Sequence, residues 1–356
     1  MDYLMEKNVL NFTLKQLETK ITKLNEKKFR AQQIFDWIYK KNIFDFEYMS
    51  NIPKSLIDKL NIELDITLPK IIKINTSKID KSIKFLLETK DKNLIESLAI
   101  LENKRVTLCI SCMIGCPLKC KFCATGTELK FKRNLDASEI IGQYITINNF
   151  LKEKNIFGNI NNVVFMGMGE PFLNLNNIEK SIEIFTHKKA LDLSKKKLVI
   201  STSGVDKGLS DFINKFKIKL AVSIHFPTNE QRSQFMPINK KVPLEKLITE
   251  LKKIDLKKRE YITIEYLMIE KINDTLFHAE KLKSLLKGLK VKVNLIPYNP
   301  TKMFFAKPSS EKRINKFANY LLSKSIFVTV RRSKSKDVTG ACGQFALKNN
   351  GVSLLK

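Results

Sequence analysis

The stretch Cys116-Pro-Leu-Lys-Cys120-Lys-Phe-Cys123 brings three cysteines together at a C-x3-C-x2-C spacing. In an iron–sulfur cube each protein thiolate usually binds one iron, so three thiolates from one loop leave the fourth iron open. The motif follows a strand-like run and precedes a helix expected to begin at Asp136, with Glu139 completing a capping box. The spacing therefore predicts a [4Fe–4S] cluster on Cys116, Cys120 and Cys123, with one iron free to bind a further ligand.

The same region contains a second arrangement of cysteines. Cys109-x2-Cys112 and Cys120-x2-Cys123 together could form a four-thiolate zinc site. The interval between the two pairs is short for a zinc knuckle, and a zinc site leaves Cys116 without a role. A disulfide framework fits less well. The N-terminus shows no signal segment with a charged part followed by an apolar part, and a chain of this size does not need disulfide bonds to be stable. The cluster is the favoured interpretation, and zinc is the alternative.

The chain carries a large excess of positive charge. Its 356 residues include 64 Lys+Arg against 36 Asp+Glu, which gives a formal net charge of +28. This excess creates a positive potential that favours polyanions, so nucleic acid is the expected partner. Membrane binding is the competing explanation, but the lysines are spread along the chain and no run approaches the ~20 apolar residues that span a bilayer. A compositional bias toward Lys, Asn and Ile would account for part of the excess. We expect a cytoplasmic protein without a membrane association.

The residue pattern divides the chain into four parts. Residues 1–65 are charged and have apolar residues at helical spacing, which predicts a helical accessory domain that binds RNA. Residues 66–104 contain three strand-like runs and predict a small β linker or extension. Residues 105–335 form the expected core domain, and residues 336–356 form a C-terminal loop.

Strand-like and helix-like segments alternate over 105–335, which predicts an α/β fold. The expected strands lie at 106–110, 162–165, 198–201, 219–224, 262–268 and 291–296, and expected helices at 136–154, 178–187, 244–254 and 276–286. Such units give a parallel sheet with helices outside it. Because their connections are right-handed, six units in sequence curve into a partial (β/α)6 barrel of the TIM type.

Polar motifs fall at the ends of these expected strands, where the sites of such barrels lie. The cysteine loop follows the first strand, and Gly169-Glu170-Pro171 follows the second. The later strands end in Ser201-Thr-Ser-Gly204, Ser223-Ile-His225, and Asn294 with Tyr298-Asn-Pro300. We therefore expect one site at this end of the barrel.

The cysteine motif with Gly169-Glu170-Pro171 resembles the radical S-adenosylmethionine superfamily. The fuller set of motifs is similar to the RlmN/Cfr family, whose members methylate an adenosine of large-subunit ribosomal RNA. The matching stretches span most of the chain in the family's order and are 116–126, 165–171, 201–204, 223–225, 236–239, 294–300 and 340–344. The resemblance implies a radical S-adenosylmethionine barrel with a [4Fe–4S] cluster and S-adenosylmethionine as cofactors.

The resemblance also implies which residues hold S-adenosylmethionine. Gly169 and Glu170 would receive its amino group, because a carboxylate accepts hydrogen bonds from an amine and glycine allows a close backbone approach. The cofactor's methionine and ribose side would meet Ser201 and the run Ser223-Ile224-His225, and its adenosine would meet Asn299. Taken singly, Ser201 could cap a strand end, His225 could be a satisfied core histidine, and Asn299 could form a turn before Pro300.

Two further cysteines carry the methyl chemistry that the resemblance implies. Cys342, in the Ala-Cys-Gly-Gln loop, would become S-methylcysteine. A radical would abstract hydrogen from that methyl group, and the resulting carbon radical, still bonded to sulfur, would add to the adenine ring. Cys109 would resolve the covalent enzyme–RNA adduct through a transient disulfide with Cys342. Glu96 occupies the position of the proton acceptor, although an outward-facing strand residue is the alternative there. Cys112 stands where the family commonly has a serine and receives no role.

These features together predict a methyltransferase acting on C2 of an adenosine in 23S ribosomal RNA, and possibly in transfer RNA. Pro171, where the C8-methylating sister type tends to have alanine, favours C2 over C8. Two competing interpretations are a radical enzyme that activates or matures a protein, and a zinc-bearing RNA-binding protein without catalysis. We expect a monomer that receives electrons from a donor such as flavodoxin or ferredoxin.

Overall fold

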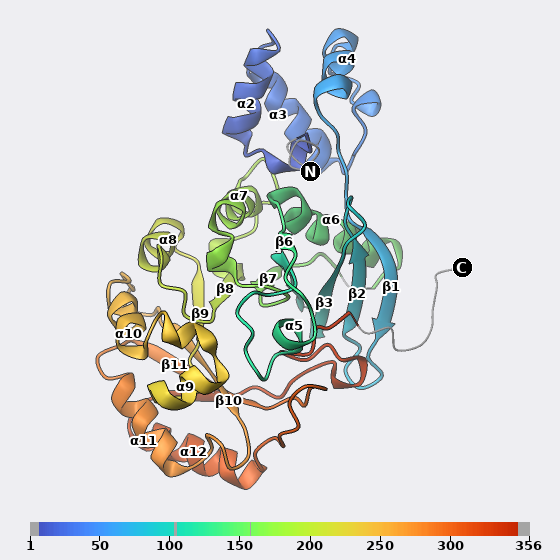
Figure 1. Cartoon of the computed structure of the whole chain (residues 1–356). Coiled ribbons are helices and arrows are strands. Elements are labelled where there is room, and N and C mark those ends of the chain that lie inside the picture. The colour runs from blue at the N-terminus through green and yellow to red at the C-terminus, as the bar shows by residue number, and fades with distance from the viewer. Residues whose placement is uncertain (1–6, 103–104, 157, 348–356) are drawn as a thin grey trace.

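A single ten-stranded sheet organises the computed structural model, which describes residues 7–102, 105–156 and 158–347 (Figure 1). The strands follow the order β1-β2-β3-β4-β7-β8-β9-β10-β11-β12, and β5 and β6 form a separate two-stranded ribbon. The strands are β1 (Lys70–Thr76), β2 (Ile83–Glu88), β3 (Leu94–Glu102), β4 (Arg105–Cys109), β5 (Met113–Ile114), β6 (Arg133–Asn134), β7 (Asn162–Phe165), β8 (Leu198–Thr202), β9 (Lys219–Ser223), β10 (Ile262–Met268), β11 (Val291–Pro297) and β12 (Phe327–Val330).

The part of the sheet from β4 to β12 is parallel, and the predicted α/β barrel fold is confirmed. All six expected strands are present, as β4, β7, β8, β9, β10 and β11, and each pairs in parallel with the next. β12 adds one more parallel strand beside β11, which the sequence pattern did not predict. β1 and β12 lie at opposite edges of the sheet, so the barrel is partial.

The three strands of the expected β linker or extension continue the main sheet. β3 pairs with β4 in antiparallel register, with Leu98 opposite Cys109, and β2 and β1 continue the sheet outward. This arrangement places the β1–β2 hairpin beside the core domain and not between two domains. It matters for function, because the hairpin contacts the C-terminal loop, as shown below.

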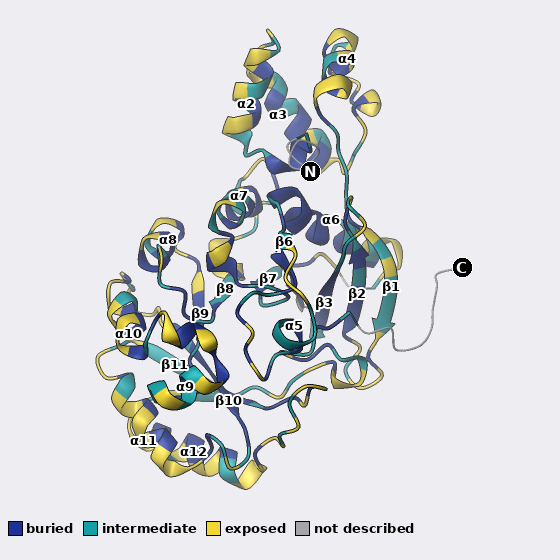
Figure 2. Ribbon diagram, in the orientation of Figure 1, coloured by how far each residue is buried: buried dark blue, intermediate teal, exposed yellow. Residues whose placement is uncertain are grey.

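Helices cover the outside of the sheet and form the N-terminal region. Apolar residues pack on one side of each outer helix while its other side is exposed, and α6 is the most deeply buried (Figure 2). The helices are α2 (Leu14–Lys23), α3 (Phe29–Phe35), α4 (Lys54–Glu63), α5 (Ala124–Thr127), α6 (Ala137–Glu153), α7 (Leu175–Thr186), α8 (Leu209–Phe216), α9 (Asn229–Phe235), α10 (Leu244–Lys252), α11 (Leu276–Leu285) and α12 (Glu311–Ser323). The shorter helical turns are Val9–Asn11, Asp36–Lys40, Phe46–Tyr48, Pro171–Leu173, Lys195–Lys197, Pro237–Lys240 and Lys336–Val338.

The start of α6 has the expected capping box. The Asp136 carboxylate accepts from the Glu139 N–H at 2.8 Å, and Glu139 accepts from the Asp136 N–H at 3.1 Å. Arg133 then binds Glu139 at 2.7 Å and Asp91 of the β2–β3 turn at 2.9 Å. These contacts fix the loop that leads from the cysteine motif into α6.

The proposed division at 65, 104 and 335 stays a prediction, and residues 1–6 and 348–356 of its terminal parts lie outside the described residues. α2, α3 and α4 stand together at one end of the molecule (Figure 1). Within the described ranges, no helix combines the length and the apolar character needed to cross a membrane.

Candidate active site

A central cavity lies at the carboxyl ends of the parallel strands, where the sequence placed the site. The residues that line it come from distant parts of the chain, because the parallel strands bring their carboxyl ends to one edge of the sheet. They include Cys109, Cys116, Cys120, Cys123, Gly169, Glu170, Ser201, Ser223, His225, Glu265, Tyr298, Arg331 and Cys342. Of the predicted cofactor residues, Ile224 and Asn299 are buried but do not line the cavity.

The three cysteines of the motif face this cavity from one tight loop. Cys123 precedes α5, and its N–H donates to the Cys120 carbonyl at 3.1 Å. The Lys121 N–H donates to the Phe235 carbonyl at 2.9 Å, which ties the loop to α9. Burial raises the pKa of all three thiols, and their mutual repulsion as thiolates adds to the effect for Cys116 and Cys120. Such thiolates need a positive partner, and an iron–sulfur cluster supplies one.

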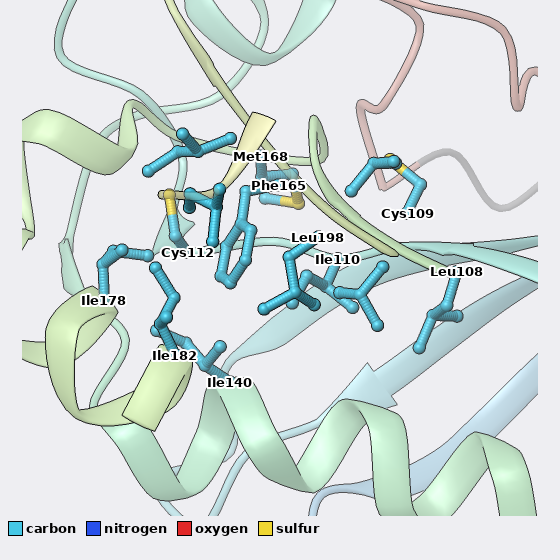
Figure 3. Close-up of a cluster of buried hydrophobic side chains, with 14 of the residues drawn as sticks. Leu108, Cys109, Ile110, Cys112, Ile140, Phe165, Met168, Ile178, Ile182 and Leu198 are labelled. Atoms are coloured by element: carbon cyan, nitrogen blue, oxygen red, sulfur yellow. The ribbon is translucent and has the colours of Figure 1, made fainter. Parts of the chain in front are cut away.

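The donors do not converge as they would around one small ion. Within the described residues, no group of three or more His, Cys, Asp or Glu side chains is arranged to hold a single metal ion. In a cube each thiolate binds its own iron, which allows wider separations between sulfur atoms than a zinc site does. Cys112, one of the four thiols of the zinc alternative, packs among hydrophobic side chains such as Phe165 and Ile178, apart from Cys109 (Figure 3).

Gly169 and Glu170 occupy the loop after β7 in a conformation that few other residues would tolerate. Gly169 has φ +105°, and a Cβ there would lie 2.6 Å from Met113 Cγ. The Glu170 carboxylate is buried and accepts from the Ser203 N–H at 2.7 Å and the Phe172 N–H at 3.2 Å. Burial raises the pKa of Glu170. A buried acid that lines the cavity in this way is suited to receive an ammonium group.

His225 also has an unusual backbone, with φ +58°. Its Nδ1 accepts from the Leu267 N–H at 3.1 Å, so Nε2 carries the ring proton and can donate. Burial, with the nearby Arg232 charge, lowers the pKa of His225 to about 3, and the ring is therefore neutral at physiological pH. This histidine is a hydrogen-bond donor in the cavity wall and not a cation.

Arg232 is a fully buried residue that the sequence analysis did not identify. Its guanidinium donates to the carbonyls of Ser203, Ser223 and Ile224 and to the Asn239 side chain, at 2.6 to 3.3 Å. These bonds join the carboxyl ends of β8 and β9, the strands that contain the predicted cofactor residues Ser201 and Ser223. Ile224 thus contributes its backbone to the site, while its side chain is in the core. A position in the helix-like run between His225 and Met236, two recognised motifs, was the only signal for Arg232.

The loop that carries Cys342 lies directly on the cysteine motif. The Ala124 N–H donates to the Gly343 carbonyl at 2.7 Å, and the Thr125 hydroxyl donates to the Phe345 carbonyl at 2.7 Å. Asn299, predicted as an adenosine contact, donates to the Cys342 carbonyl at 3.3 Å and to the Ser333 hydroxyl at 2.8 Å. Its buried Oδ1 has no hydrogen-bond partner within the described residues. Asn299 therefore holds the Cys342 loop.

Cys109 and Cys342 line the same cavity but are not bonded to each other. All six cysteines are free, with Cys109 buried and Cys342 exposed, so the disulfide bond expected from the resemblance is wrong for this structure. The physical reason is that the Cys342 loop is held by Ala124 and Asn299, which leaves its thiol open to the cavity. Burial raises the pKa of Cys109 to about 12, and the charge of Cys342 adds to this while Arg331 opposes it. Arg331, at the end of β12, has its pKa raised chiefly by Cys342 and then by Glu265.

Glu96 lies beneath the Cys342 loop and is not exposed on the strand. It is 1% exposed on β3, and its Oε1 is 2.6 Å from Lys84 Nζ on β2. Lys84 also donates to the Thr339 carbonyl at 3.1 Å and to its hydroxyl at 3.2 Å. The other carboxylate oxygen of Glu96, Oε2, is buried without a hydrogen-bond partner within the described residues. Glu96 does not itself line the cavity.

The β1–β2 turn forms hydrogen bonds with the same loop. Asp337 accepts from the Ser77 hydroxyl and the Lys78 N–H, both at 2.8 Å, and Asp80 accepts from the Ser335 N–H at 2.7 Å. The sequence analysis missed this contact, because it joins residues about 255 positions apart. A lysine among apolar strand residues, at Lys84, was the available signal, since a buried lysine needs a partner.

Comparisons with known proteins give matches over most of the chain. Residues 7–66 match the family described as the ribosomal RNA large subunit methyltransferase N-terminal domain, and residues 110–281 match the radical SAM superfamily. The chain is 43% identical over 341 residues to the probable dual-specificity RNA methyltransferase RlmN of Petrotoga mobilis, covering 95% of this chain and 96% of the relative. It is 45% identical over 345 residues to the dual-specificity RNA methyltransferase RlmN of Buchnera aphidicola subsp. Cinara cedri, covering 95% of each.

A solved structure has the same fold throughout. The crystal structure of a radical SAM methyltransferase from Sphaerobacter thermophilus superposes with a TM-score of 0.88 at 33% sequence identity. The match covers 95% of this chain and 98% of that one. The likeness therefore extends over nearly the whole chain.

Proposed function

Because this chain belongs to the RlmN family of radical S-adenosylmethionine RNA methyltransferases, we propose that it methylates C2 of an adenosine in 23S ribosomal RNA and in transfer RNA. The observation that carries the proposal is the seating of the Cys342 loop on the cysteine motif, through Ala124 and Gly343. This contact places the thiol of Cys342 in the wall of the cavity that would bind the cofactor. Pro171, directly after Glu170, supports C2 over C8 as the methylated position.

The residues that would hold the cofactors fit them chemically. Cys116, Cys120 and Cys123 would ligate a [4Fe–4S] cluster, and the buried Glu170 carboxylate with the Gly169 backbone would take the amine of S-adenosylmethionine. The neutral His225 and the wall residues Ser201 and Ser223 offer hydrogen bonds along the cavity. When bound, the cluster and S-adenosylmethionine supply a radical that abstracts hydrogen, and S-adenosylmethionine as substrate also supplies the methyl group.

The chain's own residues then have three tasks in the proposal. Cys342 accepts the methyl group, and Arg331 lines the same cavity. Glu96 takes the proton from the adenine ring, and Lys84 Nζ, 2.6 Å away, fixes the position of its carboxylate. Cys109 acts after methyl transfer, when the product RNA must be released. Lys84 thereby links the proton acceptor to the loop of the methyl carrier.

The proposed partners follow from charge and from the chemistry. A net charge of +28 supports binding to RNA phosphates. The ring position C2 is inaccessible in a paired, stacked base, so the target adenosine must be unpaired or extruded. The radical chemistry needs one electron from outside the chain, for which a small acidic donor of the flavodoxin or ferredoxin class suits the basic surface.

Mass spectrometry of nucleosides tests the proposal. We expect 2-methyladenosine in ribosomal and transfer RNA from cells that contain the protein, and its loss from cells that lack it. Restoration by the wild-type chain, but not by Cys342→Ala, completes the test. Appearance of 8-methyladenosine instead would assign the chain to the C8 chemistry, and unchanged RNA would contradict the proposed function.

A further inference from the structure

One aromatic side chain in the loop after β11 is almost fully exposed. Phe305 is 92% exposed, the largest value among the large hydrophobic side chains of the described residues. It belongs to the loop 299–309, which connects β11 to α12 at the carboxyl edge of the sheet. An exposed phenylalanine offers a flat apolar face on which another planar group can stack.

The loop that carries Phe305 is well fixed by hydrogen bonds. The Tyr298 hydroxyl accepts from the Thr301 N–H at 3.2 Å and donates to the Phe304 carbonyl at 2.9 Å. At the far end of the loop, the Glu270 N–H donates to the Lys307 carbonyl at 2.9 Å. The ring of Phe304 points inward, with its centroid 5.5 Å from that of Tyr298 and 5.8 Å from that of Phe235. An inward Phe304 fixes the loop and leaves Phe305 directed away from it.

This loop is continuous with the reaction site. Asn299 donates to the Cys342 carbonyl, and the Gln344 side chain donates to the Pro300 carbonyl at 3.2 Å. Tyr298, whose hydroxyl supports the loop, lines the central cavity. A base held against Phe305 would therefore lie next to the loop of the proposed methyl carrier.

The charges around Phe305 favour an anion with aromatic groups. Lys302 and Lys307 are exposed on either side of it in the loop. Lys121, from the cysteine motif, lies 5.7 Å from the centroid of the Phe235 ring, on which Phe304 packs. Exposed aromatic rings between lysines are the pattern of single-strand binding surfaces, where bases stack and cations contact phosphates.

We infer that Phe305 is a stacking platform for an unpaired RNA base at the mouth of the cavity, with Lys302 and Lys307 contacting the adjoining phosphates. The inference rests on the proposed function for the identity of the RNA. It adds a specific site for single-stranded RNA that lies within the core domain and not on the N-terminal helices. Such a platform would hold a neighbour of the target base, or the target itself, after it leaves its stack.

The test compares four variants of the full chain for binding to a fluorescent oligoadenylate of roughly ten nucleotides, a length within the usual site size. Phe305→Ala should raise the dissociation constant by roughly 5- to 150-fold, and Phe305→Trp should preserve affinity, because indole offers a larger stacking face. Phe305→Leu should behave like the alanine variant, since an aliphatic side chain cannot stack. The matched control is Phe277→Ala, an exposed phenylalanine 57% accessible on α11 with Lys281 beside its ring, which should bind as wild type.

The salt dependence of RNA binding distinguishes the contribution of the Phe305 ring from that of the lysines. Phe305→Ala should leave the slope of log affinity against log salt unchanged, whereas Lys302→Ala should reduce it by about 0.7, one phosphate contact on a single strand. Equal binding by Phe305→Ala and Phe277→Ala would overturn the inference, as would full affinity in Phe305→Leu. A defect of Phe305→Ala confined to reductant-dependent turnover, with RNA affinity intact, would overturn it in favour of a docking surface for the electron donor.

The failure of this inference can be told apart from failure of the proposed function. If wild-type protein methylates RNA and Phe305→Ala does so with equal KM, the platform is wrong while the function stands. If Phe305→Ala loses oligoadenylate binding but wild-type protein methylates no RNA, the platform stands and the function is wrong.

Discussion

The ammonium of Lys84 lies 2.6 Å from a carboxylate oxygen of Glu96, and both side chains are almost completely buried beneath the loop of Cys342. The same ammonium donates to the carbonyl and the hydroxyl of Thr339, three residues before that cysteine. One buried cation therefore joins strands β2 and β3 to the loop that would carry the methyl group. Lys84 is both a structural and a positioning residue.

We expect Lys84→Met to destabilise the protein by about 3–5 kcal/mol, because it leaves the Glu96 charge buried and unpaired. In Lys84→Met/Glu96→Leu most of this loss should be recovered, since no isolated charge remains. Urea unfolding measures the stability of the single and the double variant. The double variant should still fail to methylate RNA, because it lacks both the proposed proton acceptor and the anchor of the Cys342 loop at Thr339. Additive destabilisation by the two changes would show that the pair is not coupled.

The three cysteines of the motif should behave differently from their neighbour Cys112. Alanine at Cys116, Cys120 or Cys123 should lower bound iron and sulfide strongly after anaerobic reconstitution, while circular dichroism reports a folded chain. Cys112→Ala is the matched control, because Cys112 packs in the hydrophobic core, and it should keep its cluster. Zinc without sulfide in anaerobically prepared wild-type protein would contradict the cluster assignment.

Gly169 should not tolerate a side chain. A Cβ at this position would lie 2.6 Å from Met113 Cγ, in a backbone conformation with φ +105°. Gly169→Ala should therefore cost about 1–3 kcal/mol of stability through strain and should weaken S-adenosylmethionine binding, measured by calorimetry. Gly158→Ala is the control, since a Cβ there has no heavy atom within 4 Å. Equal binding by the two variants would show that the loop after β7 adapts freely.

His225 should make stability depend on pH in the acid range. Its folded pKa is about 3, below the unfolded value near 6.5, so the unfolded chain binds more protons between these values. Stability contributed by the neutral ring is then fully present above about pH 6.5 and is lost as pH falls toward 3, by at most about 1.4 kcal/mol per pH unit. The nearby Arg232 opposes protonation of the ring. Unfolding of wild type and His225→Gln across this range should differ in slope, and identical slopes would contradict the burial of a neutral histidine.

The sequence predicted most of the barrel but not the contacts that hold the loop of Cys342. Apolar runs bounded by polar motifs identified all six expected parallel strands, since buried strands read as nearly continuous hydrophobic segments. β12 was missed because Phe327–Val330 has only four residues and follows α12 directly. Arg232 looks like an ordinary surface cation in the sequence, and the partners of the buried Lys84 are set by long-range packing.

The site residues follow the same division. Motifs at strand ends correctly indicated the cavity, because the parallel sheet brings those ends together whatever lies between them. Asn299 was predicted to face the cofactor, yet in the structure it donates to the Cys342 backbone. The expected disulfide was wrong because the tethers of a loop, here from Ala124 and Asn299, are set by three-dimensional contacts and not by the spacing of cysteines.

The central claim is that Cys342 carries the methyl group, and peptide mass spectrometry of the purified protein tests it most directly. In wild-type protein that has been reconstituted and incubated with methyl-labelled S-adenosylmethionine, the peptide containing Cys342 should gain the mass of one labelled methyl group. The peptides containing Cys109 and Cys112 should gain none. The label should then leave Cys342 when RNA is added under reducing conditions and appear on adenosine. A peptide with unmodified Cys342 alongside RNA that is methylated normally would contradict the account.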